Sequence, residues 1–109
     1  MSNVNLWCIV RDTRNVFYVN TTTNNNIYDL KVSIKDRKPN YFASFDADNL
    51  ILWRVAIASS VLKDKETDIE IYLNNELENE ADTIGNTFHN IGGSDNIQVV
   101  VGVPITGEI

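Results

Sequence analysis

Hydrophobic positions along the chain follow two spacings, one typical of β-strands and one typical of an amphipathic helix. An apolar run at 5–10 and a shorter run at 16–19 lie on either side of a polar stretch. Two short apolar runs joined by turn-forming residues predict a β-hairpin. The run at 50–57 is the strongest strand signal, and the run at 96–103 predicts a further strand that Pro104 ends.

A helix is predicted between the hairpin and the strand at 50–57. Ile27, Leu30 and Ile34 recur at i, i+3 and i+7 and form one apolar stripe. The polar residues before Ile27 supply candidate N-caps, and Pro39 disfavours helical geometry in the residue before it. The pattern therefore predicts a helix over 27–37.

The segment from 58 to 80 is ambiguous. Within it, 68–73 alternates like a strand, but its acidic and asparagine-rich flanks are typical of loops. Further along, 81–88 fits a short helical turn that would place Ile84 and Phe88 on the core.

The order of elements is hairpin, helix, strand, ambiguous region and strand. A helix with one apolar stripe covers one apolar face of a sheet. We therefore predict an α+β fold of the ubiquitin-like β-grasp type, with one main helix across a mixed sheet of four to five strands. A right-handed crossover is expected if the strand after the helix is a parallel neighbour of the strand before it.

Size and composition fit one globular domain. The chain has 109 residues, of which 43% are hydrophobic and 22% are charged, and a chain of this length supports a single core. No apolar run reaches the roughly 18 residues of a membrane span, and the N-terminus lacks the basic and apolar parts of a signal peptide. Retention in the cell, unconventional export and a leader missing from this sequence all remain open.

The formal net charge of −6 argues against sequence-independent binding of nucleic acid, which requires clustered lysine and arginine. Acidic residues gather at 64–70 and again at 76–82. A solvated surface explains these clusters, and an acidic docking surface for a basic partner is the alternative.

No constellation of residues points to catalysis, a metal or a cofactor. Cys8 is the only cysteine, so an intramolecular disulfide is excluded, and its apolar surroundings in the sequence favour a buried hydrophobic role. With His89 as the only histidine, the chain has too few ligands for a typical zinc site. Gly92 and Gly93 precede the last predicted strand, which indicates a loop turn rather than a conjugation tail.

Several segments in register resemble the N-terminal module of Crinkler effectors. The runs 6–10 and 16–19 resemble the opening of that module, and 27–35 resembles its first helix. Ile84, Phe88 and the strand before Pro104 resemble its closing pattern. The span 59–80 is not aligned.

The stretch 46–55 resembles the hallmark of the family, an acidic and alanine-containing segment that runs into Leu-x-Leu-aromatic. It ends here in Leu50-Ile51-Leu52-Trp53-Arg54-Val55. This is nearer to the fungal Leu-Trp-Lys-Val form, with Arg54 in place of lysine, than to the oomycete Leu-Phe-Leu-Ala-Lys form.

The resemblance implies a secreted protein that a symbiotic or pathogenic fungus or oomycete delivers into a host cell. The module itself is associated with translocation, while separate C-terminal domains carry the activity, frequently in the host nucleus. We expect the module to span 1–105, with 106–109 as a tail or the start of a linker to a C-terminal domain.

The expected partners are proteins, either from the host or a second copy paired through an open sheet edge. The domain is expected to have no cofactor, no metal, no catalytic residues, no membrane span and no direct contact with nucleic acid.

The translocation motif also has the pattern of a central buried strand. We expect Leu50, Leu52 and Val55 to belong to the core, so that mutating them would act through unfolding. Trp53 and Arg54 are the better candidates for a contact, because these residue types are enriched in binding hot spots.

Two other functions remain as alternatives. The first is an intracellular ubiquitin-like adaptor, which detection of the protein only in the producing cell would favour. The second is a small enzyme that uses Cys8, which complete burial of Cys8 would exclude.

Overall fold

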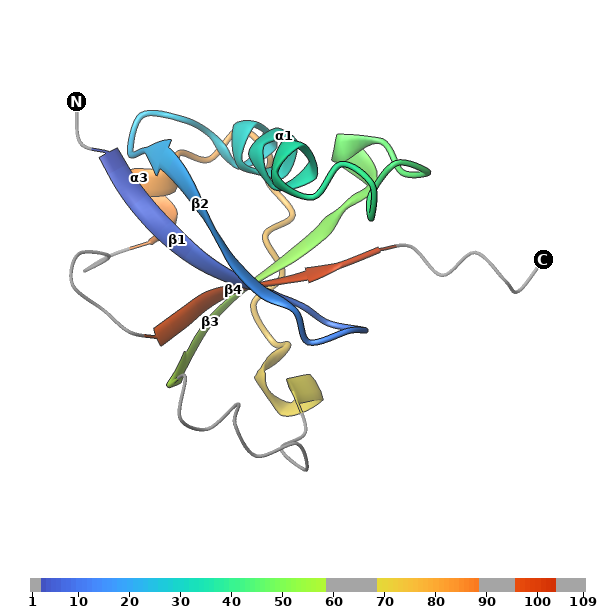
Figure 1. The fold of residues 1–109 in the computed structure, drawn as a ribbon. Coiled ribbons are helices and arrows are strands. Elements are labelled where there is room, and N and C mark those ends of the chain that lie inside the picture. The colour runs from blue at the N-terminus through green and yellow to red at the C-terminus, as the bar shows by residue number, and fades with distance from the viewer. Residues whose placement is uncertain (1–2, 59–68, 89–95, 104–109) are drawn as a thin grey trace.

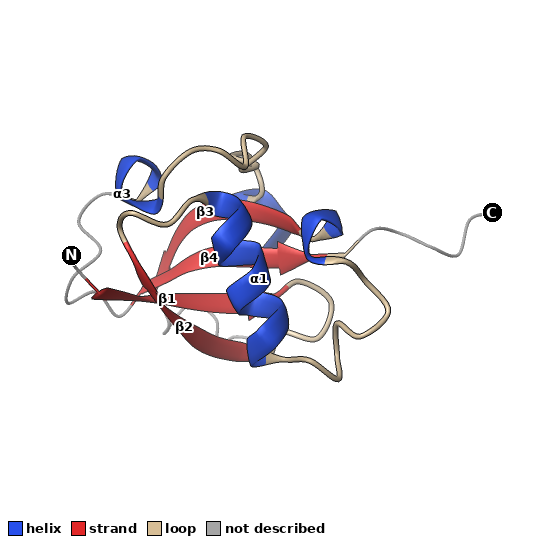
Figure 2. Cartoon of the chain, turned by 90° about the horizontal axis from the view of Figure 1, so that it is seen from above, coloured by secondary structure: helices blue, strands red, loops and turns tan. Residues whose placement is uncertain are grey.

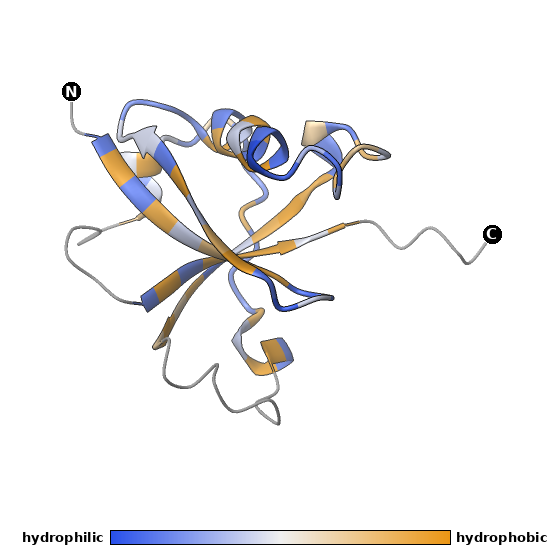
Figure 3. Cartoon of the chain, in the orientation of Figure 1, coloured by the Kyte–Doolittle hydropathy of each residue, from blue (hydrophilic) through white to orange (hydrophobic). Residues whose placement is uncertain are grey.

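The first two strands form the predicted hairpin. The structure is a computed structural model that describes residues 3–58, 69–88 and 96–103. Strands β1 (Asn3–Val10) and β2 (Val16–Thr22) pair antiparallel and extend beyond the predicted bounds. The Val10 amide donates to the Asn15 carbonyl at 2.9 Å and closes the turn. Figure 3 shows polar and apolar residues alternating along β1, as expected for a strand with one face toward a core.

Helix α1 (Ile27–Arg37) has the predicted bounds. Asn26 caps its N-terminus, where its side chain accepts a hydrogen bond from the Asp29 amide while the Asp29 carboxylate accepts one from the Asn26 amide. Ile27, Leu30 and Ile34 are buried, so the apolar stripe lies against the sheet. Figure 2 shows α1 lying across the strands.

Two further strands complete a mixed sheet. Strand β3 (Ile51–Ala58) pairs antiparallel with β4 (Asn96–Gly102), and β4 pairs parallel with β1. The strand order is β2-β1-β4-β3, which places the first and last strands at the centre, as Figure 2 shows, while Figure 1 shows α1 on one side of the sheet. This four-stranded sheet with one helix across it confirms the predicted α+β, ubiquitin-like fold. β2 and β3 are not neighbours, so the condition for a crossover between adjacent strands is not met.

The main core lies between the sheet and α1. It combines the stripe of α1 with the residues of every strand that face it, and Phe42, Ile84 and Phe88 close its ends. The predicted turn around 81–88 is helix α3 (Ile84–Thr87), which Thr83 caps by accepting a hydrogen bond from the Asn86 amide. Both Ile84 and Phe88 are buried, as predicted.

A second, smaller core covers part of the opposite face of the sheet. It contains Ile9, Trp53, Ile57, Ile69, Ile97 and Val100. The ambiguous segment supplies its cover, because 69–72 forms the 3₁₀ helix η2 (Ile69–Tyr72) rather than a strand. A short 3₁₀ helix, η1 (Ala47–Asn49), leads into β3.

Several predicted features lie outside the described residues: His89, the turn at Gly92 and Gly93, Pro104 and the expected tail at 106–109. Among the helices that are described, none is long and apolar enough to cross a membrane.

Candidate protein-binding surface around Arg54

The motif residues Leu50 and Leu52 lie beneath α1 in the main core. Leu52 is 0% exposed, and its carbonyl accepts a hydrogen bond from the Leu77 amide at 2.8 Å. Leu50 follows η1 and donates its amide to the Ala47 carbonyl. Neither side chain is accessible to a partner while the domain is folded.

Trp53 lies on the other face of the sheet and is 9% exposed. A Cβ added at Gly102 would lie 2.8 Å from the Trp53 ring, so the indole packs directly on the β4 backbone. The Arg11 guanidinium lies 5.5 Å from the ring centre, and it also forms an ion pair with Glu70 of η2. The hydrogen bond from Arg11 lowers the pKa of the Glu70 carboxyl. Trp53 therefore holds the second core together, and little of its ring reaches the surface.

Arg54 is the exposed member of the motif. Its amide donates to the Asn75 carbonyl at 2.9 Å, and its Nη1 donates to the Thr87 carbonyl at 3.1 Å. The strand register shifts between Arg54 and Ile57, where β3 bulges away from regular pairing with β4. Arg54 thus connects β3 to two segments that are distant in the sequence.

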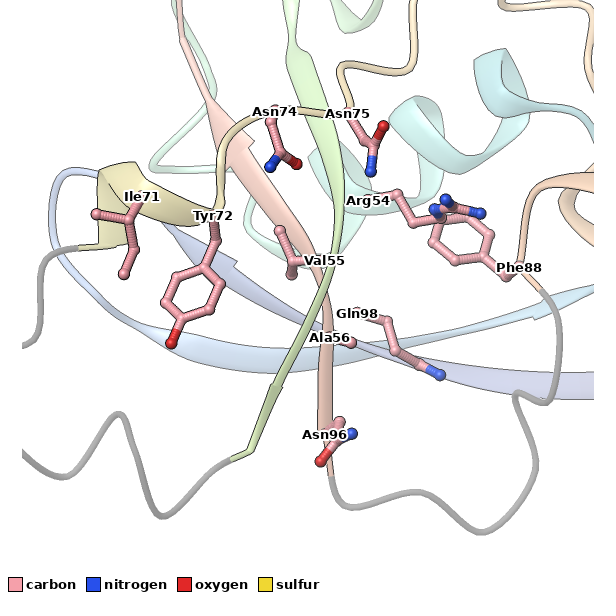
Figure 4. A pocket seen from close by; sticks show the side chains of 10 residues that line it. All are labelled: Arg54, Val55, Ala56, Ile71, Tyr72, Asn74, Asn75, Phe88, Asn96 and Gln98. Carbon is pink, nitrogen blue, oxygen red and sulfur yellow. The ribbon is translucent and has the colours of Figure 1, made fainter.

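A groove of about 470 Å³ begins at Arg54 and runs along the bulged part of β3. We call it the Arg54 groove, and Figure 4 shows the side chains that line it. Half-buried Val55 and exposed Ala56 form its β3 wall, while Tyr72 and Ile71, the latter 66% exposed, come from η2. Four amide side chains complete the polar lining: Asn74, Asn75, Asn96 and Gln98.

The composition of the Arg54 groove suits a peptide or protein surface. Amide side chains both donate and accept hydrogen bonds, so they can satisfy the backbone of a partner, while Ile71 and Tyr72 offer apolar contact. Arg54 adds a cation with five N–H donors. Among the described residues that line the groove, none carries a carboxylate, an imidazole or a thiol.

A second hollow of about 380 Å³ shares Arg54 and Asn75 with the first. Glu76, Glu78 and Asp82 line it, and these belong to the acidic cluster found in the sequence. Glu80, a fourth member, instead forms an ion pair with Lys31 at 3.1 Å. Three carboxylates of this cluster therefore line an open hollow, while the fourth, Glu80, links its segment to α1.

Sequence reasoning singled out Arg54 and Val55, although Val55 was expected in the core and is half-buried in the groove wall, and it missed the remaining residues of the groove. The ambiguous segment contains Ile71, Asn74 and Asn75. The strand at 96–103 was predicted from its apolar residues, so its polar residues Asn96 and Gln98 were not considered. The pair Asn74-Asn75, placed directly after an apolar run, was the available signal.

Cys8 is fully buried in the main core, and its Sγ lies 3.5 Å from the Leu6 carbonyl oxygen. Burial raises the pKa of the thiol well above its usual range, so the thiolate does not form at neutral pH. This placement excludes the enzyme hypothesis that rested on Cys8. In the part of the chain that the structure describes, no group of three potential ligands could hold a metal ion.

We expect Cys8 in the folded protein to resist thiol reagents at pH 8. Because the thiolate is the reactive form and the pKa is raised, labelling will be limited by unfolding. Labelling with Ellman's reagent across a urea titration checks this, with the fully unfolded protein as the reactive reference. Rapid labelling without urea would contradict the burial of Cys8.

In a comparison with protein-family models, residues 4–102 match the Crinkler effector protein N-terminal domain. The match includes all four strands, α1 and the Arg54 groove. A search of curated proteins found no match.

Proposed function

The chain belongs to the Crinkler effector family, and on this basis we propose that it is the N-terminal module of a secreted effector, which mediates translocation into host cells and protein–protein contacts without catalysis of its own. The family match supports the effector role. The division of the hallmark motif supports a contact role, since Leu50 and Leu52 are buried while Arg54 is exposed between two hollows. The placement of Arg54 is the observation that carries this proposal.

A protein partner suits the Arg54 groove better than a small molecule or nucleic acid. The groove is open, and amide and apolar groups line it, as they do the contact surfaces of proteins. The neighbouring acidic hollow would repel a phosphate backbone. A partner that presents a carboxylate or carbonyl to Arg54 and a basic side chain to Glu76 and Glu78 matches both hollows.

Replacing Arg54 with alanine is expected to reduce delivery into host cells about tenfold, because a hot-spot arginine contributes on the order of 1–2 kcal/mol to binding. Stability should change little, since the loss is one exposed hydrogen bond, about 0.5–1.5 kcal/mol. The measurement is the amount of a fluorescent reporter, fused after residue 109, that reaches host cells during contact with a producing strain.

Two variants separate recognition from folding. Lys35→Ala removes a cation from the last turn of α1, outside both hollows, and should deliver normally. Ile71→Glu places a charge in the groove on an exposed side chain and should impair delivery like Arg54→Ala. If Arg54→Ala and Ile71→Glu both deliver at the level of the original protein, the groove has no role in delivery.

We also propose bounds for the module, a source organism and a destination in the host. We take 1–105 as the folding unit, with 106–109 leading toward a further domain, and a fungal source as the motif variant indicates. The complete open reading frame tests both points. Imaging a tagged copy during host contact, with the nucleus scored separately, tests the destination; a signal confined to the producing cell would favour the intracellular adaptor.

A further inference from the structure

Among the described strands, β2 is an edge of the sheet, since it pairs with β1 alone. Hydrogen-bonded pairs alternate along an antiparallel ladder, and the Val10–Asn15 pair is bonded. By this alternation, the N–H and C=O groups of Val16, Tyr18 and Asn20 point away from β1. An extended segment from another molecule could pair with this row of groups. In the strand order, β2 lies at the opposite end of the sheet from β3, which carries Arg54.

Two hollows flank the free edge of β2. One, of about 410 Å³, contains the aromatic residues Trp7, Phe17 and Tyr18 together with Arg37 and Lys38. The other, of about 400 Å³, lies toward α1 and includes Ser33 and Asp36. They share Tyr18 and Arg37, and together we call them the β2 groove. Figure 2 shows β2 at the margin of the sheet.

The exposed aromatic residues of the β2 groove form a continuous surface. Trp7 and Tyr18 are 37% and 41% exposed, and their ring centres lie 5.2 Å apart. They are direct partners in the β1–β2 register, and Val16 follows on the same face. Every second side chain of an added strand would lie against Tyr18 and Val16, so apolar residues suit those positions.

Two cations from the C-terminal end of α1 border the same edge, and one of them, Arg37, reaches the Tyr18 ring. The Arg37 guanidinium lies 5.4 Å from the Tyr18 ring centre, and the Lys38 ammonium lies 5.6 Å from that of Phe17. Within the described residues, neither cation forms an ion pair. Asp36 borders only the hollow toward Asn20, so the positive charge is concentrated beside Phe17. In a chain of net charge −6, this is a local reversal of sign.

We propose that the free edge of β2 binds an extended peptide segment of another protein by strand addition, and that this segment alternates apolar residues with acidic ones. The apolar side chains lie against Val16 and Tyr18, and the acidic side chains meet Arg37 and Lys38. This site is separate from the Arg54 groove and does not depend on the proposed role in delivery.

A second copy of this chain fits the β2 groove less well. Two β2 strands paired antiparallel about a two-fold axis would bring α1 of both copies to the same face of a continuous sheet. Arg37 of each copy would then approach Arg37 of the other, and like charges across an interface are unfavourable.

The test uses a fluorescein-labelled nine-residue peptide in which valine and glutamate alternate, measured by fluorescence anisotropy. Binding is expected, and a matched peptide with glutamine in place of glutamate should bind at least about tenfold more weakly. In ¹⁵N-labelled protein, the acidic peptide should slow amide exchange at Tyr18 and Asn20 and leave Phe17 and Val19, already bonded to β1, unchanged.

Variants of the protein locate the site. Asn20→Pro removes an outward N–H and should abolish binding, and Asn20→Ala, which keeps that N–H, shows how much of the loss comes from the side chain alone. Arg37→Glu should weaken binding at least about tenfold. The double variant Tyr28→Glu, Asn49→Asp adds the same two negative charges at exposed positions outside the groove and should have little effect.

Three results would overturn the proposal. The first is absence of binding at millimolar acidic peptide, and the second is equal binding of the glutamine peptide. The third is concentration-dependent protection of the Tyr18 and Asn20 amides without peptide, accompanied by a dimer in light scattering, which would assign the edge to self-association.

Discussion

Replacing Leu52 with alanine is expected to lower the free energy of unfolding by about 2–5 kcal/mol, the range for removing a fully buried leucine from a packed core. Leu52 is 0% exposed and contributes to the core beneath α1. A domain of this size has a total stability of roughly 5–15 kcal/mol, so the variant loses a large part of it. Urea denaturation followed by circular dichroism measures the change.

The Leu52 result decides how the hallmark motif should be interpreted. Any loss of delivery in Leu52→Ala should follow the unfolded fraction and be partly restored at lower temperature, whereas the loss in Arg54→Ala should not. Leu52→Met keeps most of the buried volume and should cost less than about 1.5 kcal/mol. A fully stable Leu52→Ala variant that fails in delivery would make Leu52 a recognition residue, against its burial.

Trp53→Ala is expected to cost about 3–5 kcal/mol, and its effect should be largest in η2. The indole lies between Gly102, Arg11 and the apolar residues that η2 covers. Without it, Ile69 and Tyr72 lose their main support, so the segment 69–73 should open before the rest of the domain. Thermal unfolding gives the total cost, and amide exchange of residues 69–73 reports the local opening.

Trp7→Ala is the matched control for Trp53→Ala. Trp7 is also an indole on a strand of the sheet, but it is exposed and its specific contact is the Tyr18 ring, worth about 0.5–1.5 kcal/mol. Its replacement should leave the exchange of 69–73 unchanged. Equal destabilisation by the two substitutions would show that the second core is no more important than the exposed aromatic pair.

The elements with a clear period were predictable. The spacing of Ile27, Leu30 and Ile34, together with a capping asparagine and a following proline, determines α1 through interactions within about a dozen residues. The hairpin and the strands at 50–57 and 96–103 also carry their own signal. These interactions are local, so a single sequence displays them.

The segment 68–73 could not be assigned in the same way, because a strand requires an edge to pair with. The first half of the β3 edge is already occupied, since Arg54 donates to Asn75 and Leu77 donates to Leu52. Because that edge is occupied, the segment forms η2 instead, and Ile69 buries its side chain in the same core cluster as Trp53 and Ile57. Such competition for one edge is a property of the whole fold.

The candidate site likewise has one part that the sequence predicts and one part that depends on the whole fold. Arg54 was identified because its residue type is common at binding surfaces, and β3 exposes it. Its groove joins β3, β4, η2 with the segment after it, and Phe88, and their proximity depends on tertiary structure. The hydrophobic pattern also could not predict the burial of Trp53. Its ring packs on Gly102, which lies on β4 two residues beyond Val100, the register partner of Trp53.

The strand order β2-β1-β4-β3 also determines when the domain can fold during its synthesis. Among the described strands, the hairpin and β3 do not pair directly; β4 pairs with both, through partners such as Cys8 and Val99 that are about 90 residues apart in the sequence. The ribosome must therefore release nearly the whole module before the sheet can close. Until then β3 exposes its apolar residues, and the distant closure of β1 on β4 slows folding. The strands of the module therefore stay unpaired with β4 until its synthesis is nearly complete, and their edges are open to other molecules until then.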